Sequence, residues 1–221
     1  MAGRREKNKE ERRQRIRRAT FDVLLEKGFH KATVGEIAER AGVGKGTLFL
    51  YAKDKVDLSL LCINDDVDAI TDQAFNNIRF ELPLLDQILE FFRPRFEFWG
   101  QFPDLARAAT REMSTAYSPA ETSRELARGI ARRAHTKAKL TEILRVYCEQ
   151  KRPTKTFETE WLSQVILDVY LTELRFWLSA DEPRVENAIE TLRYLIAPIV
   201  QPFTKKQNNL KGPLRLARPK N

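Results

Sequence analysis

Residues 33–58 decide the fold and have the sequence TVGEIAERAGVGKGTLFLYAKDKVDL. The stretch opens with a capping box, because the Thr33 hydroxyl can accept from the backbone three residues on while the Glu36 side chain reaches back. We expect a short helix that ends just before Gly42, where glycine lets the chain turn. A second short helix is predicted over about 45–51. Two short helices joined by a glycine turn have the dimensions of a helix-turn-helix.

The second helix of such a pair lies in the major groove of DNA, while the first braces against the DNA backbone. Its outward residues have to be small or polar so that the backbone can approach the bases. Lys45, Gly46 and Thr47 meet that requirement, and Leu48 and Val43 are expected to face the core. The stretch therefore predicts a DNA-reading unit.

The rest of the chain shows apolar residues at helical spacing and no alternating strand pattern. The predicted helices cover about 9–27 (ended by Gly28), 54–79, 83–100, 103–115, 118–150, 156–179 and 183–200. We therefore predict an all-α fold class. Its parts are an N-terminal three-helix helix-turn-helix DNA-binding domain and a C-terminal helical bundle.

Positive charge is concentrated at the two ends of the chain, whose net charge is +8. Residues 1–18 carry nine Lys or Arg and three Glu, and residues 204–221 carry six Lys or Arg and no acid, so the middle is mildly acidic. A basic arm beside a DNA-reading unit adds phosphate contacts without much sequence information. We predict such contacts for Arg4, Arg5 and Arg12. A solubilising tail is the alternative for either run.

The composition argues against several other classes of protein. No run of about 18 apolar residues suggests a membrane helix, and the first 20 residues lack the apolar core of a secretory signal. Cys62 and Cys148 have no metal-ligand spacing and indicate free thiols in a reducing cytoplasm. His30 and His135 lie near no catalytic pattern, and no phosphate-cradling loop is present. We therefore predict a cytoplasmic protein that is not an enzyme and has no metal or cofactor.

Residues 12–58 resemble the TetR family of bacterial regulators. The resemblance includes the helix before the pair and a lysine after it, at fixed offsets. It rests on Ile16, Ala19, Gly28, Phe29, Ala32, Thr33, Val34, residues 37–43 and 45–49, Tyr51, Lys55 and Leu58. Beyond residue 58 the chain is similar to the family only in length and helical character.

The resemblance implies a role for each residue of the site. Thr33 and Tyr51 would contact phosphates through their hydroxyls, and Lys45 and Thr47 would face the major groove. Lys55, with the N-terminus of its helix, would reach a phosphate. Taken singly, each has a plainer alternative as a helix cap, a core residue or a solvated lysine. The implied DNA-binding set is Thr33, Gly44, Lys45, Gly46, Thr47, Tyr51 and Lys55.

Three positions depart from the family pattern. Gly44 stands where the family usually has serine, which removes a side-chain cap and a phosphate contact. Ala52 stands where phenylalanine is frequent, so packing behind the pair is expected to be looser. Leu50 replaces a residue that is frequently polar and is expected to be exposed near DNA. These departures bear on base preference and affinity.

The resemblance also implies that the C-terminal helical bundle is a regulatory and dimerisation domain, and it implies the division of the chain. We expect a basic N-terminal arm over 1–9, a helix-turn-helix DNA-binding domain over 10–58, a helical ligand-binding and dimerisation domain over 59–203, and a disordered basic tail over 204–221.

A homodimer is expected, because a palindromic operator requires two recognition helices about one DNA turn apart. The last two long helices each carry an apolar stripe and would form a two-fold interface of four helices. The alternative is that both stripes face the core of their own subunit. The predicted interface residues are Trp161, Val165, Val169, Ile189, Leu192 and Ile196.

Residues 91–99 have the sequence FFRPRFEFW, with five aromatic residues in nine. Pro94 is expected to kink the helix and open space, and aromatic walls suit an apolar or planar ligand. The alternative is that these rings form only core. The predicted pocket residues are Phe92, Phe96, Trp99 and Arg111, with Arg95 or Arg111 facing an acidic ligand group.

Together these features predict a sequence-specific transcriptional regulator that binds double-stranded DNA as a homodimer. We expect a repressor that an unknown, apolar or aromatic small-molecule effector releases from a palindromic operator. The effector would shift the helix over about 54–79, which links both domains. One alternative is a nonspecific or architectural DNA-binding helical protein without an effector, whose binding would ignore sequence and collapse with salt. Another is a helix-bundle interaction protein, against which the surface of residues 45–47 argues.

Overall fold

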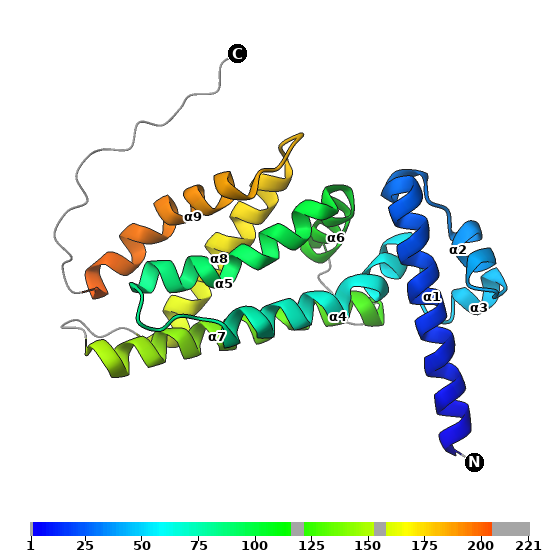
Figure 1. Ribbon diagram of the computed structural model, residues 1–221, viewed down its shortest axis with the longest axis horizontal. Helices are drawn as coiled ribbons and strands as arrows, with labels where there is room; N and C mark the ends of the chain where they lie inside the picture. The colour runs from blue at the N-terminus through cyan, green and yellow to red at the C-terminus, as the bar shows by residue number, and fades with distance from the viewer. Residues whose placement is uncertain (1, 116–121, 153–157, 205–221) are drawn as a thin grey trace.

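The computed structural model describes residues 2–115, 122–152 and 158–204 (Figure 1). Within these ranges all the regular secondary structure is helical. This confirms the predicted fold class. The helices are α1 (Ala2–Lys31), α2 (Val34–Arg40), α3 (Lys45–Leu48), α4 (Lys55–Asn76), α5 (Leu84–Gln101), α6 (Pro103–Thr115), α7 (Arg124–Lys151), α8 (Thr159–Leu178) and α9 (Val185–Val200), followed by the short 3-10 helix η2 (Gln201–Phe203).

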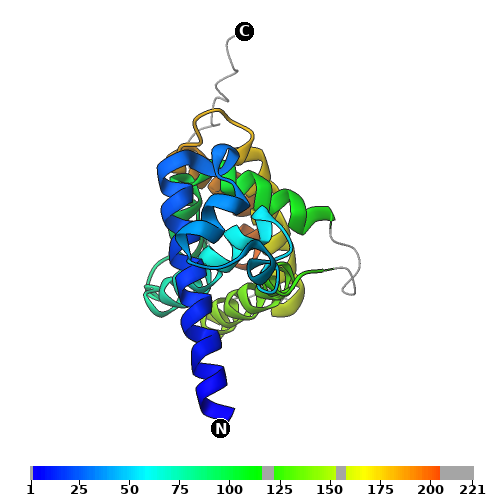
Figure 2. The same cartoon turned by 90° about the vertical axis from the view of Figure 1, so that its right-hand side faces the viewer.

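The helices form two groups that share α4. Helices α1, α2 and α3 lie together at one end, and α4 runs from beneath α1 into the larger group formed by α5 to α9 (Figure 1). The N-terminal half of α1 projects beyond the rest of the chain (Figure 2). The molecule therefore has a small helical unit connected to a larger bundle by one continuous helix.

Each group has its own hydrophobic core, and α4 contributes to both. Leu58 and Leu61 belong to the smaller core, while Leu60 and Ile63 belong to the larger one. The predicted boundary after residue 58 falls inside α4. The other buried members of the smaller core are Ile16, Ala19, Val23, Ala32, Ile37, Ala38, Ala41, Leu48 and Ala52.

Two helix starts differ from the sequence prediction. Helix α1 begins at Ala2 instead of near residue 9, because the arm consists largely of Lys, Arg and Glu, which favour helix. Helix α7 begins at Arg124 and not at residue 118, which lies outside the described residues. Its N-cap is Ser123, whose hydroxyl accepts from the Leu126 N–H and bonds Asp57 of α4. The predicted tail also lies outside the described part, except for residue 204.

The aromatic segment of α5 is core, which corrects two predicted pocket residues. Phe92 stacks on Tyr170 of α8 with ring centroids 4.1 Å apart, and Phe96 meets Trp177 edge-on at 5.1 Å. Both phenylalanines are fully buried, because rings distant in the sequence cover them. Pro94 lies inside α5, which continues to Gln101.

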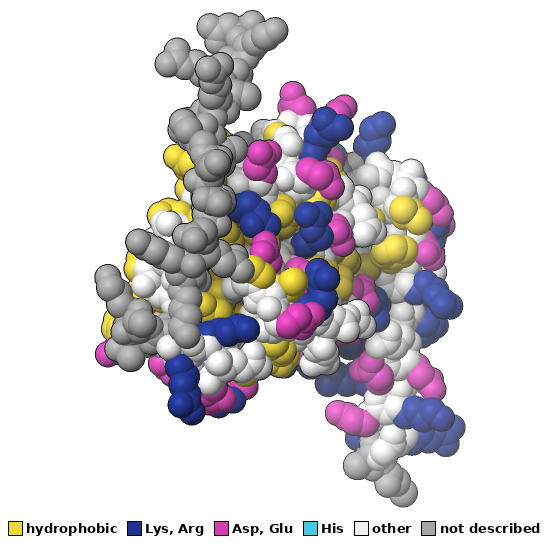
Figure 3. All heavy atoms as spheres, turned by 60° about the vertical axis from the view of Figure 1, so that its left-hand side comes forward, with side chains coloured by type: hydrophobic (Ala, Val, Ile, Leu, Met, Phe, Trp, Pro, Cys, Tyr) yellow, Lys and Arg dark blue, Asp and Glu magenta, His cyan; other side chains and the backbone are white. Residues whose placement is uncertain are grey.

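Large apolar side chains are exposed on α8 and α9, among charged ones. Trp161 is 70% exposed and Phe176 is 74% exposed on α8, and the exposed large hydrophobic residues on these helices also include Val165, Tyr194 and Leu195. The predicted interface residues Ile189, Leu192 and Ile196 are instead buried in the subunit's own core, while Val169 is half-buried. Figure 3 shows one flank of the molecule, where hydrophobic side chains reach the surface among charged ones.

We expect Glu173 to make stability depend on pH. The side chain is 5% exposed on α8 and has no hydrogen-bond or ion-pair partner among the described residues, and burial raises its pKa from 4.5 to about 7. The folded chain therefore holds a proton that the unfolded chain has already lost. The free energy of unfolding should fall as the pH rises from 4.5 to about 7, by up to about 3 kcal/mol.

Urea unfolding of Glu173→Gln at several pH values checks this expectation. The variant should lose this pH dependence and be more stable than the wild type above neutral pH. Glu190→Gln, an exposed position on α9, is the matched control and should leave the profile unchanged. An unaltered pH profile in Glu173→Gln would contradict the assignment.

Candidate nucleic-acid interface

The turn between α2 and α3 fixes the geometry of the pair. Gly42 has a φ of 63°, in the left-handed region that favours glycine. The N–H of Val43 donates to the Ala38 carbonyl at 3.0 Å, which closes the turn. Leu48 is fully buried and holds α3 against the smaller core. The opposite side of α3 is therefore turned away from the protein.

That outward side presents the residues expected to meet DNA. Gly44, Lys45 and Gly46 are exposed, and Thr47 is half-buried. The Lys45 side chain lies over Gly35 of α2, where an added Cβ would come within 3.1 Å of the lysine Cε. The surface is thus a short polar helix with small residues, as the sequence predicts for a recognition helix.

The start of α2 is a capping box, as predicted. The Thr33 hydroxyl accepts from the Glu36 N–H at 3.3 Å, and the Thr33 N–H donates to the Glu36 carboxylate at 3.0 Å. Hydrogen bonds from Lys27 and Thr33 lower the pKa of Glu36 to about 2. Thr33 itself is exposed, but its hydroxyl also donates to the Glu36 carboxylate at 2.9 Å, so the predicted phosphate contact would have to take that proton from Glu36.

Lys55 has an internal role that was not evident from the sequence. Its ammonium donates to the carbonyls of His30 at 3.2 Å and Ala32 at 3.1 Å, and lies 4.6 Å from the centroid of the Phe29 ring. Two of its three N–H bonds are thereby used to hold the link between α1 and α2 against the start of α4. The predicted phosphate contact would have to use the third.

The projecting half of α1 lies next to the end of α3. The Tyr51 hydroxyl is 3.5 Å from the Lys9 carbonyl oxygen, while its ring packs against the smaller core. Arg4, Arg5 and Arg12 are exposed along α1. The projecting end carries both basic and acidic side chains (Figure 3). The basic arm is therefore a helix continuous with the DNA-reading unit.

The departures from the family pattern have visible consequences. Gly44 is the N-cap of α3 and makes no side-chain hydrogen bond. Leu50 is 81% exposed, and its neighbour Phe49 is also exposed. Ala52 is buried in the smaller core. An apolar pair thus lies at the end of the recognition helix.

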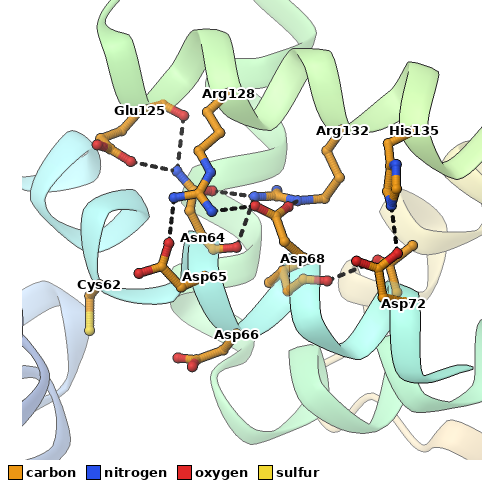
Figure 4. Close-up of polar contacts among 12 residues, drawn as sticks. Cys62, Asn64, Asp65, Asp66, Asp68, Asp72, Glu125, Arg128, Arg132 and His135 are labelled. Carbon is orange, nitrogen blue, oxygen red and sulfur yellow. Dashed lines mark hydrogen bonds and ion pairs between the residues drawn. The ribbon is translucent and has the colours of Figure 1, made fainter.

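Helix α4 connects this surface to the bundle through a row of acidic side chains. We call Asp65, Asp66, Asp68 and Asp72 the acidic row (Figure 4). From α1, Arg17 contacts Asp66 at 2.9 Å and donates through Nε to the Cys62 carbonyl. His135 of α7 contacts Asp72 at 2.8 Å.

From α7, Arg128 bridges Asp65, at 2.5 Å, and Asp68. Burial alone would raise the pKa of Asp65, but the hydrogen bond and charge of Arg128, with Arg13 and Arg17 of α1, outweigh burial and lower it. The ionised form of Asp65 is therefore favoured, and the acidic row is held from both sides by arginines of α1 and α7.

A buried part of the same network lies beside the acidic row. Asn64 donates to the Glu125 carboxylate at 2.9 Å and accepts from Arg132 at 2.6 Å, and Arg132 also bonds Asp68 (Figure 4). Arg13 of α1 comes within 3.6 Å of Glu125. The network thus joins the DNA-reading unit, α4 and α7 without interruption. The spacing of acids over 64–72 and of bases over 128–139 was the signal that could have revealed it.

The bundle contains a cavity of about 320 Å³ between α5, α6, α7 and α8. Of the predicted pocket residues, Trp99 lines it; Phe92 and Phe96 do not, and Arg111 borders a separate surface depression. The lining residues are Arg95, Trp99, Thr110, Met113, Gly129, Arg132, Arg133, Asp168, Leu171, Thr172, Leu174 and Arg175.

Two negative findings apply to the described ranges only. No group of His, Cys, Asp and Glu within them is arranged to hold a metal ion. None of the described helices is long and apolar enough to cross a membrane.

Comparison with known proteins supports the assignment of the N-terminal unit. Residues 16–61 match the family model described as "Bacterial regulatory proteins, tetR family". The chain is 33% identical over 92 residues to an HTH-type transcriptional regulator of Staphylococcus aureus strain USA300, a match that covers 38% of this chain and 50% of that protein. The chain thus spans half the length of the curated relatives it matches, and the match concerns the DNA-reading end.

Solved structures extend the similarity of fold to the bundle. The fatty acid degradation regulator FadR of Bacillus halodurans has a TM-score of 0.59 and 18% identity, covering 83% of this chain and 96% of that one. Thermus thermophilus FadR, described as a transcriptional repressor in complex with lauroyl-CoA, has a TM-score of 0.65 and 21% identity, covering 90% and 100%. At these identities the likeness establishes the fold alone.

We expect Gly44→Ser to stabilise the domain slightly. The backbone at Gly44 is already extended, and no atom lies within 4 Å of an added Cβ, so the serine hydroxyl can cap α3 without strain. The free energy of unfolding should rise by a few tenths of a kcal/mol. Gly44→Ala, which adds a Cβ but no acceptor, should be less stable than Gly44→Ser by about 1 kcal/mol. Chemical denaturation measures both, and an alanine variant as stable as the serine variant would show that no cap forms.

Proposed function

We propose that this chain, which belongs through its residues 16–61 to the tetR family of bacterial regulatory proteins, is a sequence-specific DNA-binding transcriptional regulator. The observation that carries the proposal is the outward face of α3, where Lys45 and Gly46 are exposed while buried Leu48 fixes the helix. On this proposal residues 10–58 bind DNA and residues 59–203 bind an effector and form the dimer. The boundary lies within α4, so this helix belongs to both parts.

The proposed DNA contacts are of two kinds: contacts to base edges, which read the sequence, and contacts to phosphates, which position the protein on the duplex. Lys45 and Thr47 face base edges, with Gly44 and Gly46 permitting close approach. The positioning contacts go to phosphates and come from both ends of the pair and from the arm. They are assigned to Thr33, Tyr51, Lys55, Arg4, Arg5 and Arg12. All of these side chains are exposed or half-buried, which supports the assignment.

The proposed dimer uses the outer face of α8 and α9. Trp161, Val165 and Phe176 form an exposed stripe along α8, with Tyr194 and Leu195 beside it on α9. Large apolar side chains exposed on two neighbouring helices are typical of an interface between subunits. Two-fold pairing there would present two copies of α3 to the two halves of a palindrome.

The proposed regulation is release from the operator by an effector in the cavity. Arg132 lines the cavity and also holds Asp68 and Asn64 of α4, so a ligand that changes its contacts would change how α7 holds α4. Thermus thermophilus FadR, of similar fold, is described as a repressor in complex with lauroyl-CoA, which supports a small-molecule effector and a repressor. The effector acts only if its affinity differs between the operator-bound and free conformations.

Selection of bound duplexes from random DNA tests the proposal. At near-physiological salt the purified chain should recover a palindrome with two half-sites, with an affinity at least roughly a thousandfold above that for bulk DNA. Recovery of no motif, with binding that disappears as salt rises, would contradict the regulator and favour the nonspecific DNA-binding protein.

Substitution in α3 should reduce affinity for the selected duplex. We expect Lys45→Met and Thr47→Ala each to cost about 1–3 kcal/mol of binding free energy, since each removes a contact to DNA. Lys151→Met, an exposed lysine at the far end of α7, is the control and should bind as the wild type does. Fluorescence anisotropy with a labelled duplex measures all three. Wild-type affinity in both α3 variants would overturn the assigned surface.

A charge in the α8 stripe should prevent dimerisation. Phe176→Asp places a carboxylate in the proposed apolar interface and should give a monomer that binds a single half-site weakly. Leu25→Asp changes an equally exposed apolar residue on α1 and should remain dimeric. Light scattering with size-exclusion chromatography gives the masses. A dimeric Phe176→Asp chain would show that the interface lies elsewhere.

A further inference from the structure

Arg95 of α5 is a buried cation without a counterion. The side chain is 7% exposed, and its guanidinium donates to the hydroxyls of Tyr170 at 3.1 Å and of Thr71 and Thr136 at 2.9 Å each. No carboxylate within the described ranges pairs with it. A buried charge that is hydrogen-bonded but not neutralised is costly, so an anionic partner is expected to improve the site.

The three hydroxyls fix the guanidinium in one orientation. Thr71 and Thr136 donate their own protons to backbone carbonyls one helical turn earlier, so toward Arg95 they act as acceptors. They come from α4 and α7, and Tyr170 comes from α8. Three helices therefore hold Arg95 by groups that carry no charge, and its positive charge is left for another molecule.

One nitrogen of Arg95 remains available to the cavity. Nε and Nη1 make the three hydrogen bonds, and Nη2 makes none with the described residues. Among the described side-chain nitrogen and oxygen atoms, only Gln87 Oε1 is both fully buried and without a hydrogen-bond partner. Because Nη2 also has no partner, it cannot be fully buried. Since Arg95 lines the 320 Å³ cavity, Nη2 has room there for a hydrogen-bond acceptor.

The remainder of the cavity wall favours an anion with a small apolar part. Arg132, Arg133 and Arg175 line it together with one acid, Asp168. Burial lowers the pKa of Arg132; the hydrogen bond and charge of Asp68 oppose this, and the positive charge of Arg95 adds to the lowering. The apolar part of the wall is formed by Trp99, Met113, Leu171 and Leu174.

We propose that this cavity binds a compact amphipathic carboxylate, which pairs with Nη2 of Arg95 and lays its apolar part against Trp99 and Met113. The inference rests on the proposed function and names the class of its effector. The bound carboxylate also attracts Arg132, which otherwise holds Asp68 of α4. Occupancy of the cavity thereby weakens the contact between α7 and the acidic row.

Binding of octanoate to the full-length chain, without DNA, tests the site. Octanoate should raise the melting temperature in a saturable way, and octan-1-ol, which matches it in length but lacks the charge, should bind at least roughly tenfold more weakly. Failure of octanoate to bind the wild-type chain, or equal binding of the alcohol, overturns the proposal.

Arg95→Met supplies the matched variant. It removes the buried charge and keeps most of the side-chain volume, so the ligand-free protein should melt no lower than the wild type, while octanoate affinity falls at least roughly tenfold. Arg93→Met, at a more exposed position on the same helix, should bind octanoate normally. Unchanged octanoate affinity in Arg95→Met overturns the proposal.

A second variant tests the proposal even if Arg95→Met fails to fold. Thr172→Glu brings a carboxylate to the same cavity wall and should lower octanoate affinity at least roughly tenfold. Unchanged affinity there also overturns the proposal.

Adding operator DNA separates this inference from the proposed function. Octanoate binding without any loss of operator affinity would support the carboxylate site and contradict the effector mechanism. Specific operator binding by a chain that does not bind octanoate would support the regulator and overturn the carboxylate site.

Discussion

The position of α4 between the arginines of α1 and those of α7 is the constraint on which the rest of the structure depends. Arg17 holds the acidic row from one side, and Arg128 and Arg132 hold it from the other. Exposed ion pairs of this kind contribute about 0–1 kcal/mol each. The buried members are different, because loss of one partner of Arg132 or Glu125 leaves an uncompensated buried charge at a cost of roughly 3–5 kcal/mol. The network therefore fixes the orientation of α1 and α7 relative to α4 more than it adds to the stability of the fold.

The same network gives the cavity a route to the DNA-reading surface. Arg132 lines the cavity and bonds two residues of α4, and α4 also contributes Leu58 and Leu61 to the core that supports α3. Lys55, at the start of α4, holds the link between α1 and α2. We therefore expect a change in the contacts of α7 with α4 to alter the support of α3 and of the link between α1 and α2. Packed interfaces favour discrete arrangements over gradual deformation, which suits this geometry to a two-state response.

The parts of the fold that the sequence predicted well are specified by local signals. The capping box at Thr33 and the glycine turn at Gly42 each act over a few residues, so the sequence alone is enough to locate α2 and α3. The start of α7 was mispredicted because its cap, Ser123, bonds Asp57, which lies 66 residues earlier. Periodicity locates a helix but does not reveal which distant group fixes its end.

The candidate sites were harder to predict because both depend on contacts between distant segments. Helix α9 is apolar on more than one face, and spacing alone does not tell that Leu192 is core while Tyr194 is exposed. In α5 the phenylalanines drew attention to a pocket, yet Tyr170 covers Phe92. The feature of functional interest there is Arg95, whose partners lie on three other helices.

The separation of the two recognition helices in the proposed dimer tests this role of α4 most directly. Spin labels at Leu50→Cys, in a Cys148→Ser background, should give one narrow distance distribution in the otherwise native chain. Replacing Asp65 and Asp68 together by asparagine removes the charges that α7 holds and should broaden or shift that distribution while the dimer persists. An unchanged distribution in the asparagine variant would contradict the claim that the acidic row of α4 sets the orientation of the DNA-reading unit.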